Sequence, residues 1–381
     1  MCIYFGVELI MFVFVLISFG TKQQYRNVMF AVVCILWTIV YGFRGMDVGN
    51  DTINYVYFFQ NKNGFYGTLD KPTDGIEPGF LLLMRIVLSI INNPTVIYTL
   101  QSSFMFYVIY KLYTRVNPRY AIWSLLFFFV VNWSYITLLS VAFRQAISVS
   151  LLLYGLYLFE VQKEKYANTR LKWYQKKQLV ASFLVLLFAA TVHKSTLVFI
   201  PIILFTFYFK LNRLVASVAL LVTFVISVFF SQLISQLYDF AMLQFGSSDS
   251  EMISMLENYS GSAKDANSTL LGSLARTIIY LIIVFATNKN RVGSVYFNNL
   301  VLAGCLFNIL SFSLQAGRVL FVFTLFSGCM YIPLTVGKNK LLKAAFIVFT
   351  LLYMYRSYSA FNNWEQVNIG DTTLPYKFIW E

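Results

Sequence analysis

Long uninterrupted apolar runs are the feature that most constrains how this chain folds. The runs lie at 3–20, 28–43, 79–92, 94–110, 120–139, 145–160, 179–192, 195–209, 214–236, 270–287, 294–314, 319–336 and 342–355. A helix needs about 20 predominantly apolar residues to cross a bilayer, and only helices and closed barrels satisfy their backbone in lipid. Because the runs are uniformly apolar and do not alternate as barrel strands do, they predict an all-α polytopic membrane protein. With 59% hydrophobic and only 12% charged residues, the composition excludes an ordinary soluble enzyme.

The net charge of +13 indicates membrane topology. Most basic residues fall in alternate joints between the runs: Lys22 and Arg26; Lys111, Arg115 and Arg119; Lys163, Lys165, Arg170, Lys172, Lys176 and Lys177; Lys210 and Arg213; Lys289 and Arg291; Lys338, Lys340 and Lys343. Only Glu160 and Glu164 oppose them there. Short loops rich in Lys and Arg are cytoplasmic, so we expect these joints inside the cell and no nucleic-acid partner. The long joint at 160–178 is expected to contact anionic membrane lipids.

The short run 79–92 fits this alternation only if it does not cross the membrane. We therefore predict an interfacial or re-entrant helix there, beside about twelve transmembrane helices. The first run is expected to be a retained span and not a cleaved signal peptide. Both termini then lie outside, with outer segments at 44–78, 238–269 and 356–381. No internal repeat or linker divides the chain, which favours a single integral membrane domain over 1–381.

Cationic side chains gather at one predicted depth, at or just under the outer surface. They are Arg44, Arg85, Arg144, His193, Lys194, Arg276 and Arg318. Ionisable groups inside membrane spans are costly and usually functional, and arginine is the planar donor suited to phosphate. The five arginines predict a pyrophosphate cradle. The alternative is that each arginine extends to lipid headgroups.

The outer loop that starts at Arg44 mixes a cation, acids, glycines and amides within a few residues. Asp47 and Asp51 have carboxylates that suit a metal, sugar hydroxyls or general-base chemistry. The alternative is an Asx-type turn in which Asp51 caps a following helix.

His193 is the only histidine, which argues against zinc chemistry. It is either a proton acceptor near neutral pH or an interfacial polar residue. The four cysteines lie in apolar runs without metal spacing, and nucleotide-binding and hydrolase motifs are absent from the sequence. We expect no cofactor and no metal.

Several short motifs together resemble a known family. They are Ile3-Tyr4, Arg44-Gly45-x-x-Val48-Gly49-x-Asp51-Thr52-x-x-Tyr55, Glu77-Pro78-x-Phe80, Arg144-Gln145-Ala146, His193-Lys194-Ser195, Gly317-Arg318 and Pro375-Tyr376-Lys377. In this order they resemble the EpsG-like branch of the Wzy-type polysaccharide repeat-unit polymerases, which act on O-antigen of lipopolysaccharide, exopolysaccharide or capsule. The resemblance covers nearly the whole chain.

The resemblance implies a metal-independent glycosyltransferase of C-type architecture in the bacterial inner (cytoplasmic) membrane. Its active site would face the periplasm or outer side. The growing glycan on undecaprenyl pyrophosphate would be the donor and a lipid-linked oligosaccharide repeat unit the acceptor. Expected partners are these lipid-linked oligosaccharides, membrane lipids and a chain-length regulator.

The resemblance also suggests residue roles. The donor pyrophosphate is expected to bind Arg44, Arg144, Arg276 and Arg318, because cations stabilise the charge of the leaving group. Arg44 assists there or orients Asp51, and Asp51 or His193 is the general base. The substrate and lipid cleft is expected to include Asp47, Tyr55, Glu77, Arg85, Gln145 and Lys194.

Two other functions use the same lipid-linked substrate. A flippase for lipid-linked oligosaccharides would need cations throughout a central cavity and related halves, whereas the cations here are predicted at one face. An O-antigen ligase would have a much larger late outer loop than 238–269. A small-solute transporter is the remaining alternative.

Overall fold

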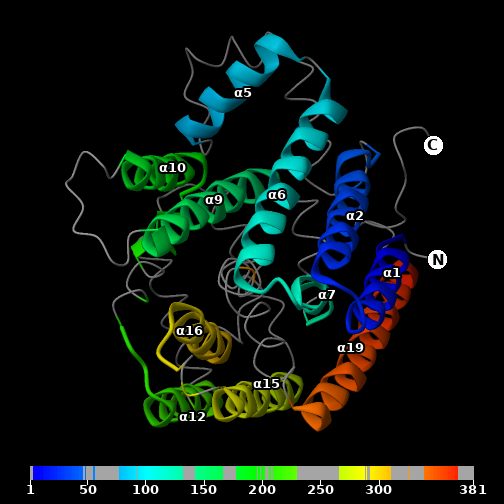
Figure 1. The fold of residues 1–381 in the computed structure, drawn as a ribbon, viewed down its shortest axis with the longest axis vertical. Helices are drawn as coiled ribbons and strands as arrows, with labels where there is room; N and C mark the ends of the chain where they lie inside the picture. The colour runs from blue at the N-terminus through cyan, green and yellow to red at the C-terminus, as the bar shows by residue number, and fades with distance from the viewer. Residues whose placement is uncertain are drawn as a thin grey trace. The chain divides into compact units, whose positions relative to one another are not determined.

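The computed structural model describes residues 3–45, 48, 55, 77–91, 93–131, 142–165, 177–194, 196–197, 199–201, 206, 209–229, 266–287, 289, 292–309, 325 and 339–367. These residues form helices and no β-strand (Figure 1). The helices are α1 (Ile3–Ser18), α2 (Gln23–Gly42), α5 (Pro78–Ile90), α6 (Pro94–Val116), α7 (Ala121–Val131), α9 (Phe143–Lys165), α10 (Lys177–Val192), α12 (Arg213–Phe229), α15 (Ala266–Ala286), α16 (Val295–Ile309) and α19 (Lys340–Val367). The predicted all-helical class is confirmed.

The chain divides into two compact units. Unit 1 contains Met1–Ile202 and Leu341–Glu381, and unit 2 contains Ile203–Lys340. The single membrane domain expected from the sequence stays a prediction.

An aromatic core holds the first helices of unit 1 together. Trp37 on α2 is fully buried, and its ring centroid lies 4.2 Å from Phe129, 5.5 Å from Tyr41 and 6.5 Å from Tyr4. Trp37 and Tyr41 are four residues apart and therefore share one helix face. These rings fix α1, α2 and α7 against one another.

Helix α19 returns to the N-terminal helices of the same unit, and Figure 1 shows it beside α1. The ring centroids of Phe5 and Tyr358 are 4.9 Å apart, and the Trp123 indole N–H donates to Thr350 Oγ1 at 3.3 Å. The helix continues past Tyr355, the predicted end of its run, to Val367. It thus extends into the segment predicted as an outer tail.

Prolines mark the starts of two helices near the site. Helix α5 begins at Pro78 and α6 at Pro94, and proline is favoured in a first turn because that turn needs no N–H donor. The Asn93 side chain caps α6 by accepting from the Thr95 N–H at 2.9 Å. The predicted run 79–92 is therefore a short helix, while its interfacial position stays a prediction.

The described helices of unit 2 are α12, α15 and α16, which are joined by buried amides. The Asn308 Nδ2 donates to the Leu220 carbonyl at 3.2 Å, and its Oδ1 accepts from Thr277 at 3.1 Å. Asn298 donates to the Thr206 carbonyl at 3.0 Å. Polar contacts of this kind hold helices together where lipid removes the hydrophobic driving force.

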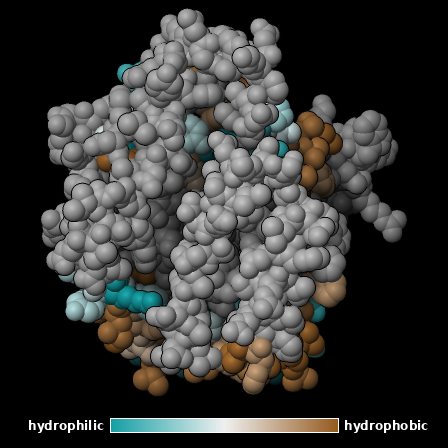
Figure 2. Space-filling model, turned by 180° about the vertical axis from the view of Figure 1, so that it is seen from behind, coloured by the Kyte–Doolittle hydropathy of each residue, from teal (hydrophilic) through white to brown (hydrophobic). Residues whose placement is uncertain are grey.

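The described helices are consistent with a helical membrane protein. By length and composition, α2 is the one described helix suited to a full crossing, and α1, α5, α12 and α16 are among the shorter apolar helices. Hydrophobic side chains remain at the surface, as the brown patches of Figure 2 show; Leu214, Leu341 and Phe229 are each more than 70% exposed. The count of about twelve crossings stays a prediction.

Candidate functional site

Glu77, the residue before α5, is the centre of a charged cluster in unit 1. Its Oε2 accepts from Arg144 Nη1 at 2.8 Å, and its Oε1 lies 2.9 Å from His193 Nδ1. The backbone N–H of Lys194 donates to the same Oε1 at 3.3 Å. Glu77 is only 4% exposed. One buried carboxylate thus joins residues from α5, α9 and the end of α10.

Arg144 is held from two sides. It is the second residue of α9, and its Nε donates to the Tyr55 hydroxyl at 3.0 Å while Nη1 binds Glu77. The side chain of Arg144 is 28% exposed and that of His193 is 26% exposed. A ligand can therefore reach both groups although their carboxylate partner is buried.

The cluster keeps Glu77 ionised. Burial by itself raises the pKa of a carboxyl group, but hydrogen bonds from His193 and from the backbone of Glu77, with the charge of Arg144, lower the pKa of Glu77 from 4.5 to about 2. The N–H of Lys194 acts in the same direction. At neutral pH, Glu77 is a fixed negative charge beside the guanidinium of Arg144.

A glycine brings the helices close enough for these contacts. A Cβ atom added at Gly79 would lie 2.7 Å from the backbone carbonyl carbon of Thr191 and would also meet the Thr191 Oγ1. Thr191 is two residues before His193 on α10. The absence of a side chain at Gly79 therefore lets the first turn of α5 pack directly on the end of α10.

Aromatic rings form the floor beneath the ion pairs. The Phe143 ring centroid lies 5.3 Å from Tyr55, 6.1 Å from Phe80 and 5.1 Å from Tyr98. Arg44 also contacts Tyr98, with its guanidinium carbon 4.2 Å from that ring centroid. Arg44 is 2% exposed, so it packs in the protein interior against these rings.

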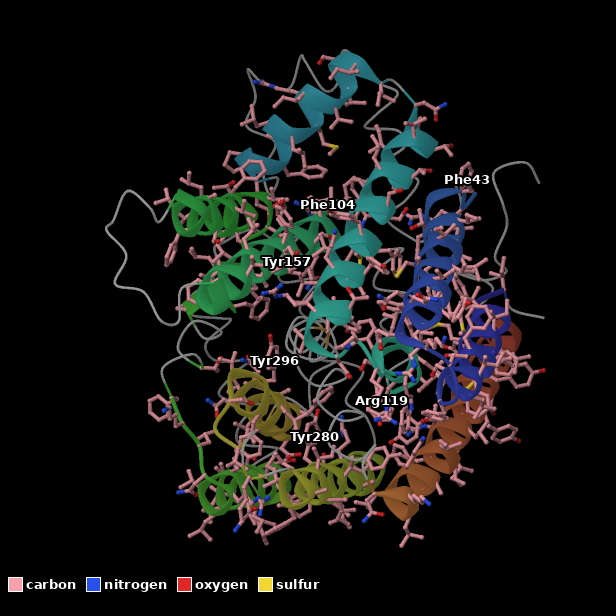
Figure 3. The ribbon with its side chains drawn as sticks, viewed as in Figure 1. Phe43, Phe104, Arg119, Tyr157, Tyr280 and Tyr296 are labelled. Atoms are coloured by element: carbon pink, nitrogen blue, oxygen red, sulfur yellow. The ribbon has the colours of Figure 1, made fainter. Side chains whose placement is uncertain are left out.

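An apolar cavity of about 200 Å³ opens beside this floor, between α5, α6 and α9. Its lining includes Met84, Val87, Ile97, Phe143 and Ile147, with Gln101 as a polar member. Phe104, labelled in Figure 3, lines it from α6. The Phe143 ring contacts Tyr55, whose hydroxyl accepts from Arg144 Nε, so these two contacts connect the cavity wall to the cation.

The structure brings Tyr55, Glu77, Arg144, His193 and the Lys194 backbone together. Gln145 is buried beside Arg144, and Arg85 is partly exposed on α5, whose next turn lines the cavity. Arg276 belongs to unit 2, where its guanidinium carbon lies 5.3 Å from the Phe307 ring centroid. Asp47, Asp51 and Arg318 lie outside the described residues. The pyrophosphate cradle of five arginines therefore stays a prediction.

Two features of the site were not predicted from the sequence. Tyr98 was not among the predicted site residues, because one tyrosine in an apolar run looks like packing. The link from Glu77 to Arg144 and His193 was also missed. An acidic residue directly before a proline that starts a helix is the sequence feature that points to Glu77.

Comparison with known protein families identifies the chain. A family model described as the EpsG family matches residues 27–378. No curated protein matches the sequence significantly, and no solved structure does so either. Because the family match covers nearly the whole chain, including every residue of the charged cluster, the protein belongs to the EpsG family.

Proposed function

We propose that this protein is a polysaccharide polymerase. It transfers the growing glycan from undecaprenyl pyrophosphate to a lipid-linked oligosaccharide repeat unit at the outer leaflet of the bacterial inner membrane. Membership of the EpsG family supports a polymerase role in polysaccharide biosynthesis. The observation that carries the proposal is the pairing of an accessible Arg144 with His193 through Glu77, beside an apolar cavity.

Arg144 is suited to the pyrophosphate of the glycan donor. As the glycosidic bond to the donor breaks, negative charge grows on the leaving pyrophosphate, and a preorganised cation stabilises that charge in the transition state. Arg144 is preorganised because Tyr55 and Glu77 each hold one of its N–H groups. We assign Arg144 to the pyrophosphate. The sequence adds Arg276 and Arg318 as further candidates for the same role, with Arg44 in a supporting position.

The cavity suits the lipid. A polyprenyl chain is an apolar ligand that needs apolar walls, and nearly all lining residues here are hydrophobic. The pyrophosphate head of such a lipid would then lie at Arg144 while its first isoprene units occupy the space along Phe143. Arg85 borders this cleft on α5.

The acceptor needs a base. Deprotonation of the attacking sugar hydroxyl by a positioned side chain is general-base catalysis, and His193 and Asp51 are the candidates from the sequence. Asp47, Gln145 and Lys194 belong to the proposed substrate cleft, and the outer loops 47–77 and 238–269 would bind sugars and set specificity. The proposed architecture is of glycosyltransferase C type, independent of metal, with the site on the periplasmic side.

A reconstituted assay tests the function. Wild-type protein, Arg144→Ala and a control Arg119→Ala are placed in liposomes with EDTA and with lipid-linked repeat units extracted from cells that express the chain. Arg119 lies two residues before α7, with its guanidinium carbon 5.5 Å from the Tyr120 ring centroid (Figure 3), and is not in the charged cluster. Products are then resolved by size.

The proposal expects a ladder of polymers from the wild type and from Arg119→Ala. Loss of one preorganised donor typically lowers kcat about 10² to 10³-fold, so the ladder should nearly vanish in Arg144→Ala. Movement of the lipid between leaflets without polymer would instead favour a flippase. Transfer of glycan to a different lipid acceptor would favour a ligase.

A further inference from the structure

Three hydrogen-bond donors from distant parts of the chain converge on the carboxylate of Glu77. Its two oxygens receive Arg144 at 2.8 Å, His193 at 2.9 Å and the Lys194 N–H at 3.3 Å. The partners lie 67, 116 and 117 positions along the chain. An arrangement that gathers distant donors on one buried carboxylate fixes the geometry of all of them.

The contact also determines which nitrogen of His193 carries the proton. An ionised carboxylate accepts hydrogen bonds and cannot donate one, so the Nδ1 that faces Glu77 Oε1 must be the protonated nitrogen. In neutral imidazole the other nitrogen then has an unshared electron pair. This nitrogen is Nε2, on a side chain that is 26% exposed.

We propose that Glu77 is a positioning residue that holds the proton of His193 on Nδ1 and thereby makes Nε2 the base for the acceptor hydroxyl. The same carboxylate holds Arg144 beside that base. This inference rests on the proposed function, and it selects His193 over Asp51 as the base. Glu77 itself is unsuited to be the base because both of its oxygens are already bonded.

The reaction then balances as a displacement at the anomeric carbon of the donor. The acceptor oxygen forms a bond to that carbon while the bond from the carbon to the pyrophosphate oxygen breaks. The electron pair of the broken bond leaves with the pyrophosphate beside Arg144. The hydroxyl proton moves to Nε2 of His193, and later release of that proton restores the neutral imidazole.

Among the described residues, the charged groups around His193 come from three parts of unit 1. Glu77 precedes α5, Arg144 lies on α9 with Tyr55 bonded to it, and Lys194 follows on the chain with an exposed side chain. Among these groups, Glu77 is the anion and makes direct contact with the ring.

The sequence permits a direct test, because His193 is the only histidine in the chain. Protein labelled with ¹⁵N-histidine and purified on a histidine-free tag gives the signals of one imidazole. The ¹⁵N shifts at alkaline pH distinguish a protonated from an unprotonated ring nitrogen. The variants are Glu77→Ala and Glu77→Gln. Glu8→Gln is the matched control because Glu8 is likewise buried, at 1% exposed, but lies on α1.

We expect the wild type and Glu8→Gln to show a protonated Nδ1 and an unprotonated Nε2. In Glu77→Ala, the proton should move largely to Nε2, as in the side chain of free histidine. Glu77→Gln should keep the wild-type pattern, because its amide oxygen still accepts from Nδ1. A wild type protonated on Nε2 overturns the inference, as does a Glu77→Ala spectrum that matches the wild type.

Activity provides the second readout. Since a general base contributes about 10² to 10⁴-fold, kcat should fall by that factor in Glu77→Ala, with partial recovery in Glu77→Gln and a smaller change in KM. If the wild type shows the expected protonation but makes no polymer, the proposed function fails while the positioning by Glu77 stands. If the wild type makes polymer but Glu77→Ala keeps the wild-type protonation of His193, the proposed function stands and the positioning role of Glu77 fails.

Discussion

The guanidinium of Arg44 is stacked on the ring of Tyr98, with 4.2 Å between its central carbon and the ring centroid. Its Nη1 donates to the Tyr41 carbonyl at 3.2 Å. Tyr98 in turn contacts Phe143, the residue before Arg144. A buried arginine at the end of α2 is therefore connected through two rings to the charged cluster.

This stacking predicts a measurable coupling between Arg44 and Tyr98. A desolvated cation over an aromatic ring contributes about 2 kcal/mol, against about 0.5–1 kcal/mol at an exposed site. A double-mutant cycle of Arg44→Met and Tyr98→Leu should give a coupling near the higher value, measured by thermal unfolding in detergent with tryptophan fluorescence. All six tryptophans belong to unit 1, so this signal reports on the correct unit.

The pair Lys111 and Tyr107 on α6 is the matched control. The Lys111 ammonium lies 5.5 Å from the Tyr107 ring centroid, and Tyr107 is 52% exposed. Its cycle of Lys111→Met and Tyr107→Leu should give the lower value. Equal couplings for the two pairs would show that burial adds nothing to the Arg44 contact.

The close approach at Gly79 predicts that this position tolerates no side chain. A Cβ there meets the Thr191 backbone at 2.7 Å, and extra atoms in a tight contact typically cost about 1–3 kcal/mol. Gly79→Ala should lower the unfolding temperature and displace Glu77 from His193, which the single-histidine spectrum would detect.

Gly6 on α1 is the control for that substitution. An added Cβ at Gly6 meets nothing within 4 Å, and alanine favours a helix over glycine by up to about 1 kcal/mol. Gly6→Ala should therefore be neutral or slightly stabilising. A Gly79→Ala protein as stable as Gly6→Ala would mean that α5 can shift without cost.

Sequence patterns predicted the helices better than their ends. The apolar runs become helices because lipid or a core must cover them, and α5 and α10 end within two residues of the predicted limits. Helix α6 instead continues to Val116 through Lys111 and Arg115. Lys and Arg are good helix formers. The change from apolar to charged residues therefore marks where the surroundings of the helix change, and the helix itself continues.

The site was predicted as a set of residues but not as an arrangement. Local motifs identified Glu77, Arg144 and His193 separately. Their meeting depends on how α5, α9 and α10 pack, which no local pattern contains. Arg44 was predicted at or just under the outer surface, and that depth stays a prediction. Its burial against the Tyr98 ring depends on the packing of α2 on α6, which no local pattern contains.

The lowered pKa of Glu77 predicts loss of stability in acid. A carboxyl group with a depressed pKa in the folded state stabilises that state above its ordinary pKa of 4.5, and the contribution disappears as pH falls towards about 2. The shift corresponds to about 3 kcal/mol. Tryptophan-detected thermal unfolding of the wild type should show this loss between those pH values.

Glu77→Gln should start with a lower stability at neutral pH and lose less of it in acid, since the amide does not titrate. Glu8→Gln serves as the comparison because Glu8 lies outside the cluster. Parallel acid profiles for the wild type and Glu77→Gln would contradict a stabilising charge at Glu77.

In unit 2, the amide of Asn308 predicts a coupling among three helices. Asn308 on α16 is 1% exposed and binds both Leu220 on α12 and Thr277 on α15. Replacement by leucine leaves the Thr277 hydroxyl without this acceptor, and interhelical polar contacts in membranes contribute about 0.6 kcal/mol on average and up to about 1.7 kcal/mol. Asn308→Leu should therefore destabilise unit 2 by an amount in that range.

Cys305 provides the probe, because unit 2 contains no tryptophan in its sequence. It lies partly buried on α16, one turn before Asn308. With the other cysteines replaced by alanine, a fluorogenic maleimide reports the temperature at which Cys305 becomes accessible. Asn308→Leu should lower that temperature, and adding Thr277→Val should cost little more because the shared hydrogen bond is already lost. Additive effects of the two substitutions would show that Thr277 and Asn308 act independently.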